Sequence, residues 1–237
     1  MSAQAPPDFG TRSEVHELMD SSDLDPAELA ETLAELASVN EFLGGYSTTL
    51  GSLARLIPPG RREFDVLDVG SGGGGTARRI VEWASRRGLT ARVHGIDLAP
   101  EAVAYARRSS AGMPGLEFSV QDLFDLPAEP KYDIVHAALV LHHLPDDAAV
   151  KALGKMYGLC RLGLVINDLH RHPVAYHSIE RLTALLSKNR LIRHDAPLSV
   201  LRAFRRSGLE GLARRASLPA PEISWCWAFR WRMIVHK

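Results

Sequence analysis

The sequence is short of several features that mark particular classes of protein. Its 237 residues include two cysteines, Cys160 and Cys226, which are too few for a disulfide framework or a cysteine zinc site. No apolar run approaches the roughly eighteen residues that a membrane-spanning helix needs. The N-terminal residues lack the basic start and apolar stretch of a secretory signal. We therefore expect a protein of a reducing compartment, the cytoplasm.

An excess of charge of one sign is also missing. Lysine plus arginine and aspartate plus glutamate number 28 each, so the formal net charge is zero. No overall positive field draws the chain toward nucleic acid or toward an anionic membrane surface. We therefore expect no nucleic-acid partner, while local basic patches remain possible.

Between residues 61 and 170, short apolar runs alternate with stretches of helical period. The runs predict strands at 64–69, 91–97, 116–120, 132–138 and 161–167, and helices are expected at 75–87, 100–109 and 146–158. This alternation is typical of α/β proteins with parallel strands and helices on both faces. The sequence thus predicts a doubly wound, Rossmann-like, mostly parallel sheet.

The ends of the chain have a different pattern. Residues 1–57 are predicted to form a helical cap, with one helix beginning at Pro26 behind Asp25 and another over 46–57. Residues 171–217 are helical in character, and 221–237 predict an antiparallel hairpin at the sheet edge. One face of that hairpin is expected to be apolar: Ile223, Trp225, Trp227, Phe229, Trp231, Met233 and Val235. With no convincing linker, residues 1–237 are expected to form one domain around the core at 61–170.

A glycine-rich corner follows the first predicted strand, with five glycines at positions 70–75. Glycine in such numbers indicates that a ligand approaches the backbone closely. Two patterns fit: G-x-G-x-x-G through Gly75, which is typical of dinucleotide sites, and D-x-G-x-G-x-G, which begins at Asp68 and continues through Gly70, Gly72 and Gly74. A tight turn without a ligand is the structural alternative.

Carboxylates at successive strand ends favour one of these ligands. Asp97 ends the second predicted strand, where an acid accepts both hydroxyls of a ribose, and Asp122 closes the third, where it can accept the amino group of an adenine. Asp68 lies at the mouth of the glycine corner and would repel a pyrophosphate, but it would attract an amino group and a sulfonium. The combination favours S-adenosylmethionine (SAM), while each aspartate alone could also be a helix cap.

With these residues the chain resembles the class I SAM-dependent methyltransferases, and "YDIVHAALVLHHLPDD" at 132–147 is similar to a segment of the ubiquinone-biosynthesis type. The resemblance covers about residues 40–170. It implies SAM as cofactor, with Asp68, Gly70, Gly72 and Gly74 at the methionine end, Asp97 at the ribose and Asp122 at the adenine. Leu98, Leu123 and the cap residue Tyr46 complete the expected cofactor set.

Histidines are the candidates for chemistry on the acceptor side. We expect His170 to act as general base, oriented by Asp168, with His143 as the second choice. Each of them could instead brace a loop. No metal site is expected, because the spacing of His170 and His172 has no fixed geometry and no cysteine supports it. An amphipathic stretch at 173–192 either covers an acceptor pocket or packs as an ordinary helix: Ile179, Leu182, Leu185, Leu186 and Ile192.

The function predicted from the sequence is SAM-dependent methylation of a small hydrophobic or aromatic molecule. The acceptor is expected to be phenolic, quinone-like or polyketide-like, with oxygen as the first choice of target and carbon of a quinone-like ring as the second. Nucleic-acid amino methylation is disfavoured because residues 136–139 read HAAL, where such enzymes carry N/D-P-P-F/Y. Alternatives of another class are an NAD-dependent oxidoreductase and a non-catalytic SAM-binding protein.

Overall fold

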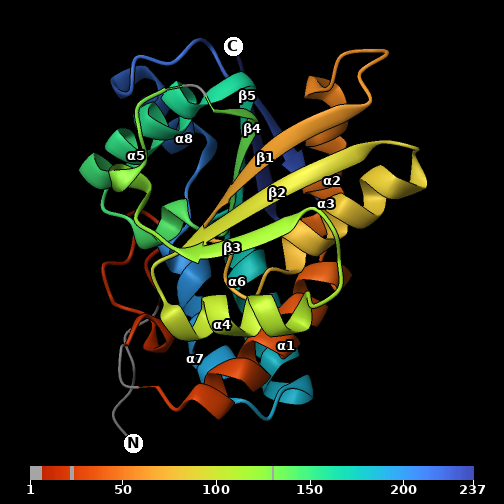
Figure 1. Ribbon diagram of the computed structural model, residues 1–237. Coiled ribbons are helices and arrows are strands. Elements are labelled where there is room, and N and C mark those ends of the chain that lie inside the picture. Colours follow the sequence, from red (N-terminus) through yellow and green to blue (C-terminus); the bar gives the residue numbers. More distant parts are fainter. Residues whose placement is uncertain (1–6, 22–23, 130) are drawn as a thin grey trace, which may run out of the picture.

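The computed structural model describes residues 7–21, 24–129 and 131–237. At its centre is a seven-stranded sheet in the order β3-β2-β1-β4-β5-β7-β6 (Figure 1). The first five strands are parallel, and β7 runs antiparallel to both β5 and β6. The strands are β1 (Glu63–Val69), β2 (Thr90–Asp97), β3 (Leu116–Val120), β4 (Tyr132–Ala138), β5 (Cys160–Leu169), β6 (Glu222–Cys226) and β7 (Arg230–His236). The predicted mostly parallel sheet and its C-terminal hairpin are confirmed.

Helices bury both faces of the sheet. Side chains of α2 (Gly45–Leu56), α3 (Gly75–Arg86) and α4 (Pro100–Ser109) form one core cluster with the strands, and those of α5 (Asp146–Leu159) and α8 (Arg206–Arg215) form another. Alternate residues of β1 enter the two clusters, Phe64 and Val66 on one face and Leu67 and Val69 on the other. A strand buried on both sides has no polar face, which explains the continuous apolar runs.

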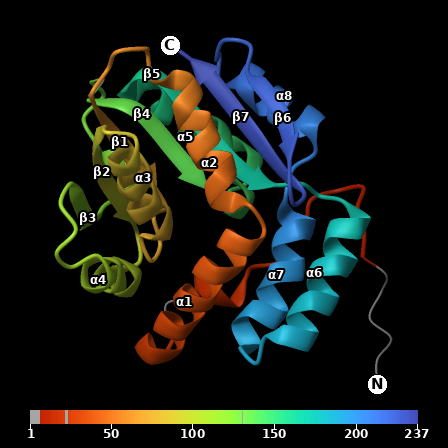
Figure 2. The same cartoon turned by 90° about the vertical axis from the view of Figure 1, so that its right-hand side faces the viewer.

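Three further helices, α1 (Pro26–Phe42), α6 (Pro173–Leu186) and α7 (Arg190–Arg202), gather away from the sheet faces (Figure 2). As predicted, α1 begins behind Asp25, whose Oδ1 accepts hydrogen bonds from Ala27 N at 2.8 Å and Glu28 N at 3.1 Å. Short 3₁₀ turns occur at Leu18–Asp20 (η1), Leu123–Asp125 (η2) and Leu141–His143 (η3). Among the described residues, no helix has the length and apolar character needed to cross a membrane.

The C-terminal hairpin only partly buries its predicted apolar face. Ile223, Trp231, Met233 and Val235 join the core cluster of α5 and α8. Trp225 and Trp227, near the turn of the hairpin, are instead 48% and 65% exposed. The core therefore covers one end of this face and leaves exposed both Trp225, the register partner of Trp231, and Trp227 in the turn.

Candidate active site

The three predicted cofactor carboxylates occupy one edge of the sheet. Asp68 is the penultimate residue of β1, Asp97 ends β2, and Asp122 follows β3, where it caps η2 by accepting a hydrogen bond from Phe124 N at 2.8 Å. Because β3, β2 and β1 are parallel neighbours, their carboxyl ends lie together. The structure thus brings these acids to the same edge.

The glycine corner connects β1 to α3 in a conformation that side chains disfavour. Gly70, Gly72 and Gly74 have φ values of +65°, +50° and +73°, in the left-handed region. A Cβ at Gly70 would lie 2.5 Å from Val140 Cγ2, and one at Gly74 would lie 2.7 Å from Phe118 Cζ. These glycines are therefore required both by the backbone and by the packing around it.

Asp97 ties this corner to the second strand. Its Oδ2 accepts a hydrogen bond from Gly72 N at 2.8 Å, and its Oδ1 accepts one from Ala99 N at 3.0 Å. Each carboxylate oxygen has a second lone pair, so Asp97 can still accept hydroxyl groups. The acid thereby orders the turn and remains available to a ligand.

Asp68 shows what kind of ligand the corner fits. The residue is 2% exposed, and its Oδ1 lies 2.7 Å from His136 Nδ1. Its Oδ2 is buried and has no hydrogen-bond partner among the described residues. A buried carboxylate oxygen without a partner is costly, and a cationic donor such as an ammonium group removes that cost. A phosphate would instead be repelled, so the donor set fits SAM rather than a dinucleotide.

Aromatic and apolar side chains cover the corner from outside. A Cβ at Gly73 would lie 3.0 Å from Tyr105 Cε1 of α4 and 3.4 Å from Leu33 Cβ of α1. A Cβ at Gly75 would meet the hydroxyl of Tyr46, which is 7% exposed and whose pKa is raised by burial. The predicted cofactor residue Tyr46 therefore lies against the corner.

The two leucines of the predicted cofactor set differ from each other. Leu98 follows Asp97 and is 70% exposed, whereas Leu123 follows Asp122, is 8% exposed and belongs to a core cluster. Their cofactor roles stay predictions.

On the neighbouring part of the edge, a histidine and an aspartate form a buried pair. His142 lies in η3, just after β4, and its Nδ1 is 2.7 Å from Oδ1 of Asp168 in β5. The backbone N–H of His142 donates to Asp168 Oδ2 at 3.2 Å. Burial alone would raise the pKa of Asp168, but the charge and hydrogen bond of His142 outweigh it, so this pKa is lowered. When the ring is neutral, the carboxylate favours the tautomer with the proton on Nδ1, which leaves Nε2 as an acceptor.

The expected pair of Asp168 with His170 does not form. Asp168 is occupied by the His142 ring and also accepts a hydrogen bond from Leu169 N at 2.7 Å. His170 Nδ1 is buried without a hydrogen-bond partner among the described residues, and its ring lies 4.6 Å from that of Trp231. Burial, followed by the charges of His172 and Arg205, lowers the pKa of His170 to about 4. The structure therefore pairs Asp168 with His142 instead of His170, and the catalytic roles of Asp168, His170 and His143 stay predictions.

A carboxylate from the N-terminal segment faces this pair. Glu17 is 6% exposed, and its Oε1 lies 3.7 Å from His142 Nε2, while Oε2 lies 4.0 Å from Nε2 of His143. Ser199 Oγ donates to Glu17 Oε1 at 2.8 Å. Burial raises the pKa of Glu17 despite these partners. No motif or spacing in the sequence points to Glu17, because only folding brings it to the histidines.

The N-terminal segment is fixed in this position by backbone contacts. Leu18 N and Met19 N donate to the two oxygens of Asp195 in α7, at 2.8 Å and 2.9 Å. Arg202 Nη1 donates to Val15 O at 2.7 Å, and its Nη2 donates to His143 O at 2.9 Å. The segment therefore forms a wall of the region that contains His142.

Comparisons with known proteins find methyltransferases. The family model of the methyltransferase domain matches residues 66–163. A ubiquinone biosynthesis O-methyltransferase of Xanthomonas axonopodis pv. citri (strain 306) is 39% identical over 129 residues, which cover 52% of this chain and 49% of the relative. Over residues 66–163 the chain is thus similar to class I SAM-dependent methyltransferases.

Solved methyltransferases share the fold at low sequence identity. Human N-acetylserotonin methyltransferase, crystallised with SAM, has a TM-score of 0.63 at 20% identity, with 90% of this chain and 56% of that chain covered. A SAM-dependent methyltransferase from Aquifex aeolicus has a TM-score of 0.62 at 17% identity, with 90% and 99% covered. The chain spans about half the length of the curated relatives that it matches.

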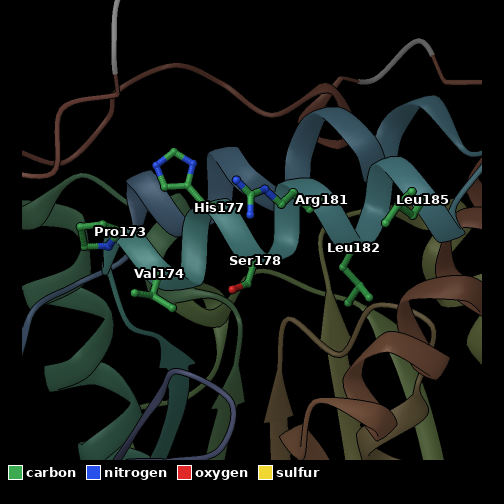
Figure 3. A pocket seen from close by; sticks show the side chains of 7 residues that line it. All are labelled: Pro173, Val174, His177, Ser178, Arg181, Leu182 and Leu185. Atoms are coloured by element: carbon green, nitrogen blue, oxygen red, sulfur yellow. The ribbon is translucent and has the colours of Figure 1, made fainter.

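Two cavities lie away from the three strand-end carboxylates. One, of about 540 Å³, runs along α6, where Val174, Ser178 and Leu182 point to the same side of the helix (Figure 3). The other, of about 530 Å³, lies between α1, α2 and α3 and includes Tyr46 and Gly75. Neither cavity is lined by Asp68, Asp97 or Asp122.

The amphipathic stretch at 173–192 combines both expected behaviours. Ile192 is 1% exposed and belongs to the interior, whereas Leu185 and Leu186 are 83% and 76% exposed. Leu182 and Leu185 line the cavity along α6. One part of the stretch therefore packs, and another part lines a cavity.

Proposed function

We propose that this methyltransferase-family chain transfers the methyl group of SAM to the oxygen of a small hydrophobic or aromatic acceptor. The observation that carries the proposal is the unpaired, buried Oδ2 of Asp68 beside a glycine corner in left-handed conformation. Asp68 would hold the ammonium group of SAM, Asp97 the ribose hydroxyls and Asp122 the adenine amino group. When bound, SAM supplies an electrophilic methyl carbon on a sulfonium.

The chain's own contribution to the reaction is alignment and removal of a proton. In the proposed mechanism, Nε2 of His142 accepts the proton of the acceptor hydroxyl, and Asp168 stabilises the imidazolium that forms. The burial of His142, which is 2% exposed, strengthens that attraction. His142 thereby replaces His170 as the proposed base, with Asp168 in the orienting role predicted for it.

Two observations support an apolar acceptor. The cavity along α6 presents Val174, Leu182 and Leu185 together with Arg181 and His177. The curated relatives named above act in ubiquinone biosynthesis, according to their names. A phenolic, quinone-like or polyketide-like acceptor suits both, and a single domain in the cytoplasm remains the proposed setting.

Calorimetric titration with S-adenosylhomocysteine and with NAD tests the cofactor. We expect saturable binding of S-adenosylhomocysteine and none of NAD; the reverse result would establish the oxidoreductase alternative. A screen of phenols, quinones and polyketide acids with methyl-labelled SAM then tests catalysis. Binding without transfer to any acceptor class would favour a non-catalytic SAM-binding protein, and transfer to ring carbon would establish C-methylation.

A further inference from the structure

A buried line of hydrogen bonds leads from the glycine corner into the sheet. Asp68 and His136 are register partners on the neighbouring strands β1 and β4, and their side chains meet at 2.7 Å between Oδ1 and Nδ1. On the other side of the ring, Nε2 lies 2.9 Å from Oγ1 of Thr49 in α2. His136 is 0% exposed and Thr49 is 1% exposed, so these polar atoms depend on one another.

The line continues through two more strands. Asn167 of β5 donates through Nδ2 to Thr49 Oγ1 at 3.0 Å and to Gly45 O at 2.8 Å. Arg230 of β7 donates through Nη1 to Asn167 Oδ1 at 3.4 Å and through Nη2 to Oδ1 of Asn40, in α1, at 2.8 Å. An arginine has only donors, so Asn167 must present its oxygen to Arg230 and its amide nitrogen to Thr49.

With a neutral His136 ring, these partners give the hydrogen bonds of the line one consistent direction. The hydroxyl oxygen of Thr49 accepts from Asn167, so its single hydrogen is free to point at His136 Nε2. In that arrangement His136 carries its proton on Nδ1 and donates it to Oδ1 of Asp68. The donor direction therefore runs from Asn167 through Thr49 and His136 to Asp68, and one oxygen, Asp68 Oδ2, is left without a partner.

We propose that His136 is a positioning residue that, backed by Thr49 and Asn167, holds Asp68 with Oδ2 directed at the ammonium group of SAM. The proposal rests on the proposed function. A carboxylate fixed at one oxygen by a chain of donors does not have to be reoriented when the cofactor binds, and that pre-organisation favours affinity. His136 contacts neither cofactor nor acceptor in this scheme and acts only through Asp68.

The test compares two ligands that differ in the amino acid portion. S-adenosylhomocysteine contains the ammonium group, and 5′-methylthioadenosine lacks it while keeping the adenosine. Thr49→Val removes the hydroxyl at nearly constant shape. We expect it to weaken S-adenosylhomocysteine binding about three- to tenfold, the range of one ordinary hydrogen bond, and to leave 5′-methylthioadenosine unchanged. Thr49→Ser restores the hydroxyl and should bind both ligands like the wild type.

Two more variants keep the test decisive. His136→Asn retains a nitrogen donor near the Nδ1 position and should preserve most of the affinity for S-adenosylhomocysteine. His136→Leu has no such donor and should lose that affinity. Thermal unfolding shows whether each variant is folded. Equal weakening of both ligands by Thr49→Val would overturn the positioning role and leave a structural one. If the wild type binds neither ligand, the proposed function fails. If Asp68→Asn selectively weakens S-adenosylhomocysteine but Thr49→Val does not, only this inference fails.

Discussion

The carboxyl edge of the sheet has two parts, which we call the first edge (the ends of β1, β2 and β3) and the second edge (the ends of β4 and β5). The two parts differ in where their candidate functional residues come from. On the first, each acid lies at or next to the end of its own strand, and the glycine corner is a single contiguous segment. On the second, the buried pair joins η3 to β5, and Glu17 arrives from the N-terminal segment. The proposed cofactor site is thus built from residues at successive strand ends, while the proposed proton-transfer site also takes a residue from the N-terminal segment.

The sharpest way to test the second edge is to remove its proposed base. His142→Ala should lower turnover by about 10²- to 10⁴-fold, the usual contribution of a general base, while affinity for S-adenosylhomocysteine stays unchanged. Single-turnover rates with labelled SAM and calorimetry on the same variant measure both quantities. His170→Ala is the matched control and should keep most of the activity; equal losses in the two variants would remove the distinction between these histidines.

Removing a carboxylate from the first edge should instead weaken binding of the cofactor. Asp97→Ala should cost about 1.5–3 kcal/mol of cofactor affinity, the range of a hydrogen bond to a charged group, and should weaken 5′-methylthioadenosine as well, because both ligands contain the ribose. Calorimetry with each ligand gives the values. Wild-type affinity in a folded Asp97→Ala protein would exclude Asp97 from the cofactor site.

The difference between the edges also explains how far the sequence could predict this molecule. Apolar runs in the sequence predict strands that are buried on both faces. The glycines at 70–75 predict a backbone that a ligand can approach closely. The pairing of Asp168 with His142 rather than His170 depends on where η3 folds back against β5. His136 lies inside an apolar strand run and shows its partners only when β1, β4 and α2 are packed together.

Backbone strain provides a third comparison, between a glycine at the first edge and one in an ordinary helix. Gly70→Ala places a side chain at φ +65° and close to Val140, so it should destabilise the protein by about 1–3 kcal/mol. Gly51 lies exposed in α2 with no atom within 4 Å of a Cβ, and Gly51→Ala should stabilise by about 0.5–1 kcal/mol through helix propensity. Denaturant unfolding measures both; a neutral Gly70→Ala would show that the corner does not require glycine there.

The smallest expected effect concerns His170, a half-buried histidine that has no role in the proposed mechanism. Its pKa falls from 6.5 to about 4 on folding, chiefly through burial, so between these values the unfolded chain binds the proton more tightly than the folded one. The free energy of unfolding should therefore decrease as the pH is lowered from about 6.5 to about 4. The ring is partly exposed, so solvent screening limits this contribution to on the order of 1 kcal/mol.

His170→Asn should reduce the slope of stability against pH in that window, measured by urea unfolding at several pH values, without changing turnover at neutral pH. An unchanged slope would show that His170 titrates alike in both states, and a large loss of turnover would return it to the acceptor site in place of His142.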